Sequence, residues 1–211
     1  MSEGSAHAAN GPRYGWREKV DFMIAVCALV TSIASIYLTV VQGDDMQRLV
    51  QAQSWPFLGI STGNTRTNPA DGRQEAVITL ELDNLGVGPA KIQTFEMWFD
   101  GKPVTNNYEL MRACCTDVAA GKTIPGTDES PILTSSALNR VLRAGQSITL
   151  LQWAKPGTDT QAWDRLNRAR FEIKHRICYC SVFDECWTSD LESTKATPVK
   201  ACPVVERPYR E

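Results

Sequence analysis

A long run of residues without charge is the strongest pattern in the sequence. No Asp, Glu, Lys or Arg occurs in residues 22–43, and Asp21 and Asp44 flank the run. As an α-helix these residues extend about 33 Å, enough to cross a hydrocarbon core of about 30 Å. A core helix is usually shorter and amphipathic, and the apolar part of a cleaved signal peptide is only roughly 7–15 residues long. The pattern therefore predicts an uncleaved signal anchor with a transmembrane helix over residues 20–43.

The residues after the run keep a helical pattern up to a proline. Met46, Leu49 and Val50 fall on one helix face with polar residues between them, and Pro56 ends the pattern. We therefore expect a juxtamembrane helix and linker over residues 44–56. Its apolar face offers one way for two copies of the chain to associate, and small residues four apart in the span offer another.

Basic residues are unevenly distributed around the run. Arg13, Arg17 and Lys19 precede it, whereas Arg48 is the one basic residue within about 15 residues after it. Short flanking segments rich in Lys and Arg stay in the cytoplasm. We therefore expect residues 1–19 to form a cytoplasmic tail and the C-terminal bulk to lie on the opposite side of the membrane.

The remainder of the chain, residues 57–211, alternates between apolar and polar positions as β-strands do. Strands are expected at residues 76–83, 90–99, 147–153 and 170–182. Short helices are expected at residues 107–113 and 160–169, the second capped by Thr158 or Asp159. Several strands separated by turns favour a β-sandwich over alternating β and α units.

Two stretches resemble immunoglobulin-like β-sandwich modules of bacterial surface proteins. The segment NLGVGPA at residues 84–90, leading into a strand that ends at Asp100-Gly101, is similar to their N-x-G-x-x-x-A hairpin. The segment VLRAGQSITL at residues 141–150 is similar to a turn and strand that such modules carry later.

The layout of the whole chain resembles uncharacterised single-pass envelope proteins of Gram-negative bacteria. The resemblance includes SWPF at residues 54–57 and ICYCSVFDECW at residues 177–187. It implies an immunoglobulin-like β-sandwich with one or two short helices, preceded by a single transmembrane helix. It also implies a bacterial inner-membrane location with the C-terminal domain in the periplasm, and it brings no known activity.

Composition and motifs narrow the classes of function. The 22 Lys and Arg against 24 Asp and Glu give a net charge of −2, so no basic excess attracts nucleic acid. The mean hydropathy of −0.25 averages an apolar span and a polar domain. No phosphate-binding loop, dinucleotide motif, His-Glu-x-x-His helix or Gly-x-Ser-x-Gly elbow occurs. We therefore expect no catalysis, no cofactor and no metal, and we interpret His175 as a core residue of an apolar strand face.

Six of the seven cysteines follow the span, in which Cys27 lies. They are Cys114, Cys115, Cys178, Cys180, Cys186 and Cys202. An even number in an oxidising compartment predicts up to three disulfides, with fifteen pairings open. Cys178 and Cys180 point the same way on a strand and are expected to bond to other segments. Cys180 and Cys186 flank a turn and could face each other, whereas the adjacent Cys114 and Cys115 are not expected to bond together.

The cysteines also allow a second function. Cys178, Cys180 and Cys186, with Cys202, could serve a thiol-redox or metal-dependent accessory protein, although their spacing lacks the usual Cys-x-x-Cys.

A membrane-anchored binding module without catalysis is our preferred hypothesis. Its tryptophans Trp98, Trp153 and Trp187 would form a possible binding surface. Its expected partners are the lipid bilayer and either another envelope protein or a second copy of the chain.

Overall fold

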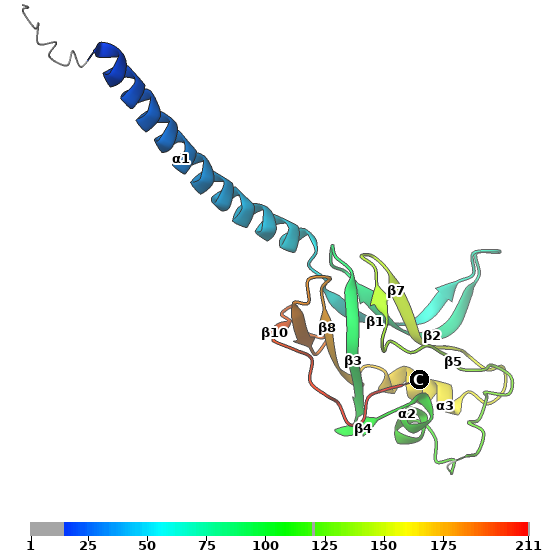
Figure 1. Cartoon of the computed structure of the whole chain (residues 1–211). Helices are drawn as coiled ribbons and strands as arrows, with labels where there is room; N and C mark the ends of the chain where they lie inside the picture. Colours follow the sequence, from blue (N-terminus) through cyan, green and yellow to red (C-terminus); the bar gives the residue numbers. More distant parts are fainter. Residues whose placement is uncertain (1–14, 120, 211) are drawn as a thin grey trace, which may run out of the picture. The chain divides into compact units, whose positions relative to one another are not determined.

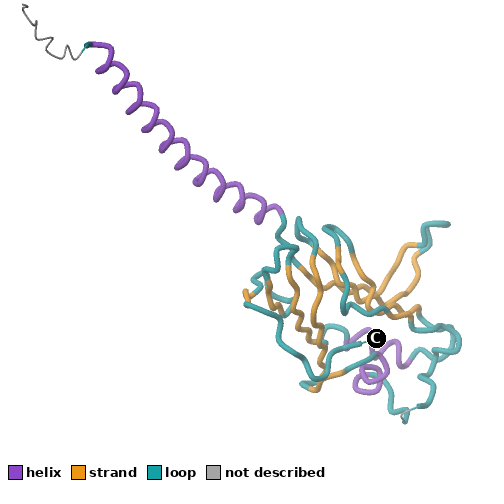
Figure 2. The backbone as a smooth tube through the Cα atoms, viewed as in Figure 1, coloured by secondary structure: helices purple, strands orange, loops and turns teal. Residues whose placement is uncertain are grey.

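The chain divides into two compact units, Met1–Val50 and Gln51–Glu211. The computed structural model describes residues 15–119 and 121–210. A single long helix makes up the described part of the first unit, and strands dominate the second (Figures 1 and 2). Most of the expected tail, residues 1–14, lies outside the described residues.

Helix α1 spans Trp16–Gln53 without a break and includes the expected juxtamembrane helix. Within the described residues it is the one helix that is long and apolar enough to cross a membrane. The serine and threonine hydroxyls in its apolar part all donate to carbonyls of the preceding turn, at 2.7 to 3.0 Å. These donors therefore need neither water nor a neighbouring helix.

The second unit contains ten strands and two short helices among its described residues. The first strands are β1 (Leu58–Thr67), β2 (Gln74–Asn84), β3 (Ala90–Phe99) and β4 (Lys102–Val104). After helix α2 (Asn107–Cys114) come β5 (Leu133–Thr134), β6 (Val141–Leu142) and β7 (Ser147–Ala154). Helix α3 (Gln161–Ala169) precedes β8 (Lys174–Cys180), β9 (Cys186–Ser189) and β10 (Thr197–Val199).

These strands form two antiparallel sheets that share one hydrophobic core. The first sheet has the order β1-β2-β7-β5, and the second has the order β10-β9-β8-β3-β4 with β6 paired to β3. One face of β2 points inward: Ile78, Leu80 and Leu82 are buried in the same core cluster as Phe95 and Met97 of β3. The expectation of a mainly β domain with short helices is confirmed.

Local sequence signals account for several element ends. Asp100 and Gly101 adopt φ of 47° and 70° and close the β3–β4 hairpin, the geometry that an Asp-Gly turn requires. At the start of α2 the side chain of Asn106 accepts the Glu109 N–H at 2.9 Å, and the Glu109 carboxylate accepts the Thr105 N–H at 2.7 Å. The two bonds satisfy backbone donors that a helix start leaves open.

Two expectations about helix α3 and strand β8 were wrong. Neither Thr158 nor Asp159 caps α3: the cap position is Thr160, whose hydroxyl donates to Asp164 instead of accepting a backbone N–H. The strand expected at residues 170–182 covers only Lys174–Cys180. It starts late because the chain makes a turn after α3, in which the Glu172 N–H donates to the Ala169 carbonyl at 2.8 Å.

Candidate functional site

Two disulfides lie on the outer face of strand β8. Cys178 bonds to Cys202 with a Cα–Cα distance of 5.6 Å, and Cys180 bonds to Cys186 across the β8–β9 pair at 4.0 Å. Both expectations for this strand are confirmed: Cys178 and Cys180 bond to other segments, and Cys180 faces Cys186 across the turn. The side chains share a face because they are two residues apart on a strand.

The third disulfide contradicts the sequence-based expectation. Cys114 and Cys115 are bonded to each other, although adjacent cysteines were not expected to pair. Helix α2 ends between them: Cys115 has φ of −132° and leaves the helical conformation, which turns its side chain toward Cys114. The Arg165 guanidinium donates to the Cys115 carbonyl at 3.3 Å and holds this end of the helix against α3.

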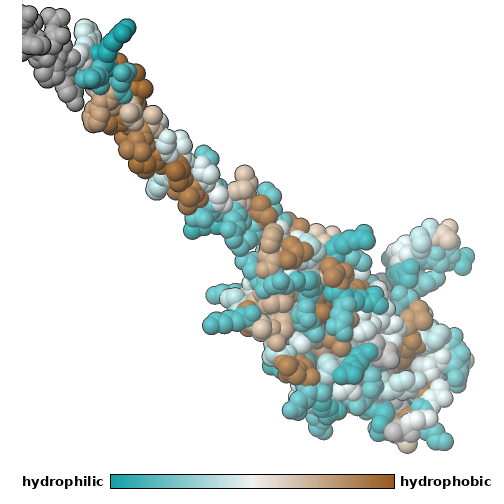
Figure 3. All heavy atoms as spheres, in the orientation of Figure 1, coloured by the Kyte–Doolittle hydropathy of each residue, from teal (hydrophilic) through white to brown (hydrophobic). Residues whose placement is uncertain are grey.

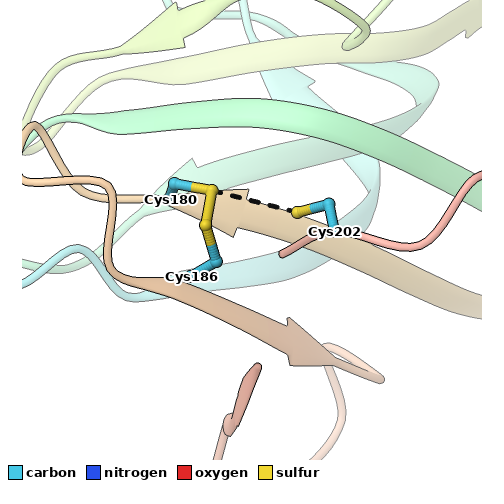
Figure 4. Close-up of side chains that lie close together, drawn as sticks. All are labelled: Cys180, Cys186 and Cys202. Atoms are coloured by element: carbon cyan, nitrogen blue, oxygen red, sulfur yellow. Dashed lines mark hydrogen bonds between the residues drawn. A yellow bond between two sulfur atoms is a disulfide. The ribbon is translucent and has the colours of Figure 1, made fainter. Parts of the chain in front are cut away.

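The two disulfides on β8 are in contact with each other. The Cys180 Sγ lies 3.9 Å from the Cys202 Sγ (Figure 4). The sulfur atoms of Cys180, Cys186 and Cys202 all lie within 4.8 Å of one another. Cys202 is half-buried and lines a surface hollow of about 600 Å³, whereas Cys180 and Cys186 are buried. A metal requires deprotonated thiolates, so this trio would hold an ion only after both disulfides were reduced.

The three tryptophans do not form the binding surface expected from the sequence. Trp153 is completely buried, and its indole N–H donates to the Ser130 carbonyl at 2.8 Å. Trp187 packs against the core beside Tyr179, with the ring centroids 6.0 Å apart. Trp153 is buried and Trp187 half-buried because the alternation of β7 and β9 turns both side chains to the inner face.

Trp98 alone lies on the outer face, within a charged cluster. The guanidinium of Arg176 lies 5.1 Å from the Trp98 ring centroid and binds the Glu96 carboxylate through two bonds of 2.8 and 3.0 Å. The hydrogen bond to Glu96 raises the pKa of Arg176. This arrangement satisfies a nearly buried carboxylate and covers part of the indole, which makes it a cross-strand support of the sheet.

His175 lies in the core, as the sequence suggested. Its ring stacks on Phe95 at a centroid distance of 6.0 Å and is 6% exposed. Neither ring nitrogen has a hydrogen-bond partner among the described residues. Burial, reinforced by the charge of Lys174, lowers the pKa of His175 to about 4. The imidazole is therefore neutral at physiological pH and has no contact that would make it a general base.

The start of the domain is held in place by the buried side chain of Asn84. Its amide nitrogen donates to the carbonyls of Gly88 and Leu142 at 2.9 and 3.0 Å. Its oxygen accepts the Gly86 N–H at 3.1 Å and the Phe57 N–H at 3.4 Å. One side chain therefore ties the β2–β3 loop to β6 and to the segment that leads into β1.

Close backbone packing accompanies these bonds. The N–H groups of Val87 and Gly88 both donate to the Trp55 carbonyl, at 3.1 and 3.2 Å. A Cβ on Gly88 would lie 2.0 Å from the Ser54 carbonyl oxygen, and one on Gly86 would lie 2.3 Å from the Phe57 nitrogen. The glycines of the sequence NLGVG are therefore required for the β2–β3 loop to lie directly on residues 54–57.

Exposed apolar side chains surround this end of the domain. They are Trp55, Leu85, Val87, Val182 and Phe183, each between 43% and 69% exposed. We call these five residues the apolar rim. Apolar side chains, drawn brown, are visible at this end of the domain in Figure 3. Exposed apolar patches are typical of interaction sites.

Neighbouring strands bring the two loops of the rim together. The β2–β3 loop leads into β3 and the β8–β9 loop follows β8, and these two strands pair with Lys91 opposite Cys180. Lys91 also forms an ion pair with Asp184 in the β8–β9 loop. The Cys180–Cys186 disulfide closes the base of that loop. The rim is therefore built on short, braced loops.

The rim was not predicted from the sequence, because both loops were interpreted only as turns. A signal was present: Leu85 and Val87 alternate with glycines, and Val182 and Phe183 precede Asp184. Turns are usually polar, so large apolar residues inside them indicate a contact surface when no core position accounts for them.

Comparison of the chain with known proteins finds no counterpart. No model of a protein family matches the sequence, no curated protein matches it, and no solved structure matches the fold.

Proposed function

We propose that this chain is a single-pass membrane protein that acts by binding another protein through the apolar rim, without catalysis of its own. Helix α1 would anchor it in the lipid bilayer of a bacterial inner membrane. The second unit would lie in the periplasm and the residues before α1 in the cytoplasm. The distribution of Arg and Lys around the run supports this orientation, and three disulfides suit an oxidising compartment.

We further propose that the domain is an immunoglobulin-like sandwich. Supporting this, the order β1-β2-β7-β5 corresponds to the A-B-E-D sheet of that fold. The order β9-β8-β3 corresponds to the G-F-C sheet, with β4 as an added strand beside it. The chain departs from antibody domains in its disulfides, because both cysteines of β8 bond within the second sheet or to the segment after it instead of bridging to β2.

The apolar rim is the observation that carries the binding function. Its side chains lie in water unless a partner covers them, and loss of water from apolar surface is the main driving force of association. Its loops are fixed by Asn84, the Lys91–Asp184 pair and a disulfide. Little conformational entropy is therefore lost when a partner binds. The near balance of charge in the chain favours a protein partner over nucleic acid.

Site-specific photo-crosslinking tests the rim in the cells that make the protein. A benzophenone amino acid replaces Phe183 in one variant and Phe171 in the other. Phe171 is the matched control, because it is an exposed phenylalanine just after α3, before β8 begins. We expect a discrete protein adduct from position 183 and none from position 171. Absence of an adduct at 183, or the same adduct at both positions, would contradict the proposal.

The accessible Cys178–Cys202 disulfide favours thiol exchange as a second candidate function. In this reaction a thiolate of a partner dithiol attacks the Cys202 sulfur and forms a mixed disulfide, and Cys178 leaves as the thiolate. The second thiol of the partner then displaces Cys202, so the partner is oxidised and the Cys178–Cys202 pair is reduced. The half-buried position of Cys202 beside a hollow gives the partner access.

Alkylation after limited reduction separates the two candidates. The protein is treated with one equivalent of dithiol per chain, and free thiols are trapped and located by mass spectrometry. Thiol exchange predicts label at Cys178 and Cys202 before any other position. Equal labelling of all three disulfides, or none, would leave the binding function alone.

A further inference from the structure

Cys202 is the most accessible cysteine of the two β8 disulfides, and its segment is the least constrained. Cys178, Cys180 and Cys186 are buried on strands β8 and β9, whereas Cys202 is half-buried. Residues 201–208 belong to no helix or strand, and no loop hydrogen bond in the described part of the chain involves their backbone groups. The strands therefore hold three of the sulfur atoms, while the fourth is free to shift.

The sulfur of Cys202 lies against the neighbouring disulfide. Its Sγ is 3.9 Å from the Sγ of Cys180, and Figure 4 shows the two sulfur atoms facing each other. Two atoms that react with each other need a separation of about 3–3.5 Å, so a shift of about 0.5 Å brings Cys202 within reach of Cys180.

We propose that Cys180 is the internal acceptor for Cys202 in thiol exchange. Once a partner dithiol has reduced the Cys178–Cys202 bond, the Cys202 thiolate attacks the Cys180 sulfur. The Cys180–Cys202 bond forms, the Cys180–Cys186 bond breaks, and Cys186 leaves with the electron pair and takes up a proton. The chain keeps one β8 disulfide and has free thiols at Cys178 and Cys186. The partner dithiol is the one reductant that the sequence of steps requires.

This internal step carries reduction to a bond that a partner reaches poorly. Cys180 and Cys186 are only 5% and 8% exposed, so a partner dithiol has little access to their sulfur atoms. Cys202 provides an indirect route, because it lines the surface hollow and also contacts Cys180. Access to Cys202 therefore gives access to the Cys180–Cys186 bond.

The Cys180–Cys186 bond closes the base of the β8–β9 loop, which carries Val182 and Phe183 of the apolar rim. Without this bond the loop has more conformational freedom, and binding through the rim costs more entropy. Reduction that enters at Cys202 therefore weakens binding at the rim. The inference rests on the thiol exchange and the rim binding proposed above, and it links the two.

Removal of single cysteines tests the internal step without any partner. Every variant also carries Cys27→Ala, so that no second free thiol is present. In Cys186→Ser, the free Cys180 faces the Cys178–Cys202 bond, and in Cys178→Ser, the free Cys202 faces the Cys180–Cys186 bond. The full-length variants are alkylated in acid and their peptides are mapped without reduction. We expect the Cys180–Cys202 bond in about a tenth or more of the chains.

Cys115→Ser is the matched control, because it frees Cys114 on α2 and leaves both β8 disulfides in place. We expect no Cys180–Cys202 bond in this control. Absence of that bond from both test variants would overturn the internal step. The same amount of it in the control would also overturn the step, because the exchange would then not depend on the contact between the two sulfur atoms.

Two measurements on the chain with all its cysteines test the link to the rim. After one equivalent of dithiothreitol, the alkylated position should move with time from Cys202 to Cys186. Treatment of cells with dithiothreitol should lower the Phe183 photo-adduct roughly threefold, and the double variant Cys178→Ser/Cys202→Ser should resist this loss. An adduct that persists in the treated wild type rejects the link. A missing adduct before treatment rejects the rim alone, because the peptide maps decide the internal step separately.

Discussion

At the start of the domain, a few small residues determine how the backbone segments pack together. Asn84 satisfies backbone groups from three segments, and Gly86 and Gly88 leave room for residues 54–57. The strand β2 before them was predictable from alternation, whereas the bonds of Asn84 were not. A sequence pattern shows that a turn is present but not which distant backbone groups its side chains will meet.

Adding one methyl group should loosen this junction. In Gly88→Ala the new Cβ would lie 2.0 Å from the Ser54 oxygen, so the backbone must move. We expect a loss of about 2 kcal/mol in the free energy of unfolding, measured by urea titration of residues 51–211. Gly157→Ala is the control, because its Cβ would meet only Glu129 at an ordinary 3.5 Å. Equal stability of the two variants would contradict the close packing at Gly88.

Acid should destabilise the domain partly through His175. Its pKa is lowered to about 4 in the folded state, whereas an unfolded His titrates near 6.5. The unfolded chain therefore binds a proton between these values that the folded chain excludes, and stability falls as pH falls through this window. From pH 7 to pH 5 the loss is about 2 kcal/mol. His175→Leu should reduce the pH dependence of urea unfolding by that amount, and an unchanged dependence would refute the buried neutral imidazole.

At the scale of elements, the periodicity of apolar residues predicted which side of a strand faces the core. The pairing of Cys114 and the placement of the tryptophans depended instead on where each element ends and how it is turned. The inward faces of β2 and β3 followed from alternation, because burial repeats every second residue on a strand. The Cys114–Cys115 bond did not follow, because it depends on where α2 ends. The packing of Trp153 and Trp187 against the core depended on the face to which each strand turns, which their position near strand ends does not reveal.

The two disulfides on β8 should contribute unequally to stability. Cys178–Cys202 joins residues 24 apart, whereas Cys180–Cys186 joins residues 6 apart. A longer closed loop removes more entropy from the unfolded chain. Replacing the first pair by alanine should cost about 3 kcal/mol, and replacing the second about 2 kcal/mol.

Urea unfolding of the two double variants measures the difference. A larger loss for Cys180→Ala/Cys186→Ala would mean that holding the β8–β9 loop matters more than the length of chain closed. The same variant should also weaken the Phe183 photo-adduct if the rim binds as a braced surface.

At the scale of the whole molecule, one chain combines an apolar helix with a domain fixed by disulfides. The apolar part of the helix was predictable because 22 successive residues without charge rarely occur in a water-exposed or amphipathic element, whereas its start at Trp16 lies within the residues expected to form the tail. The apolar rim was not predictable, because it arises only when the paired strands β3 and β8 bring together two loops distant in sequence. The proposed binding function therefore depends on a surface that forms only when the chain folds.

Mapping the cysteines of the full chain tests the central claim most directly. Cells that make the protein are treated with an alkylating agent to trap free thiols, the membranes are isolated, and peptides are analysed without reduction. The account predicts that the protein is in the membrane fraction, that Cys27 is the single alkylated cysteine, and that the other six form the pairs 114–115, 178–202 and 180–186. Alkylated cysteines in the domain, or protein released in the soluble fraction, would contradict a disulfide-bonded domain anchored outside the cytoplasm.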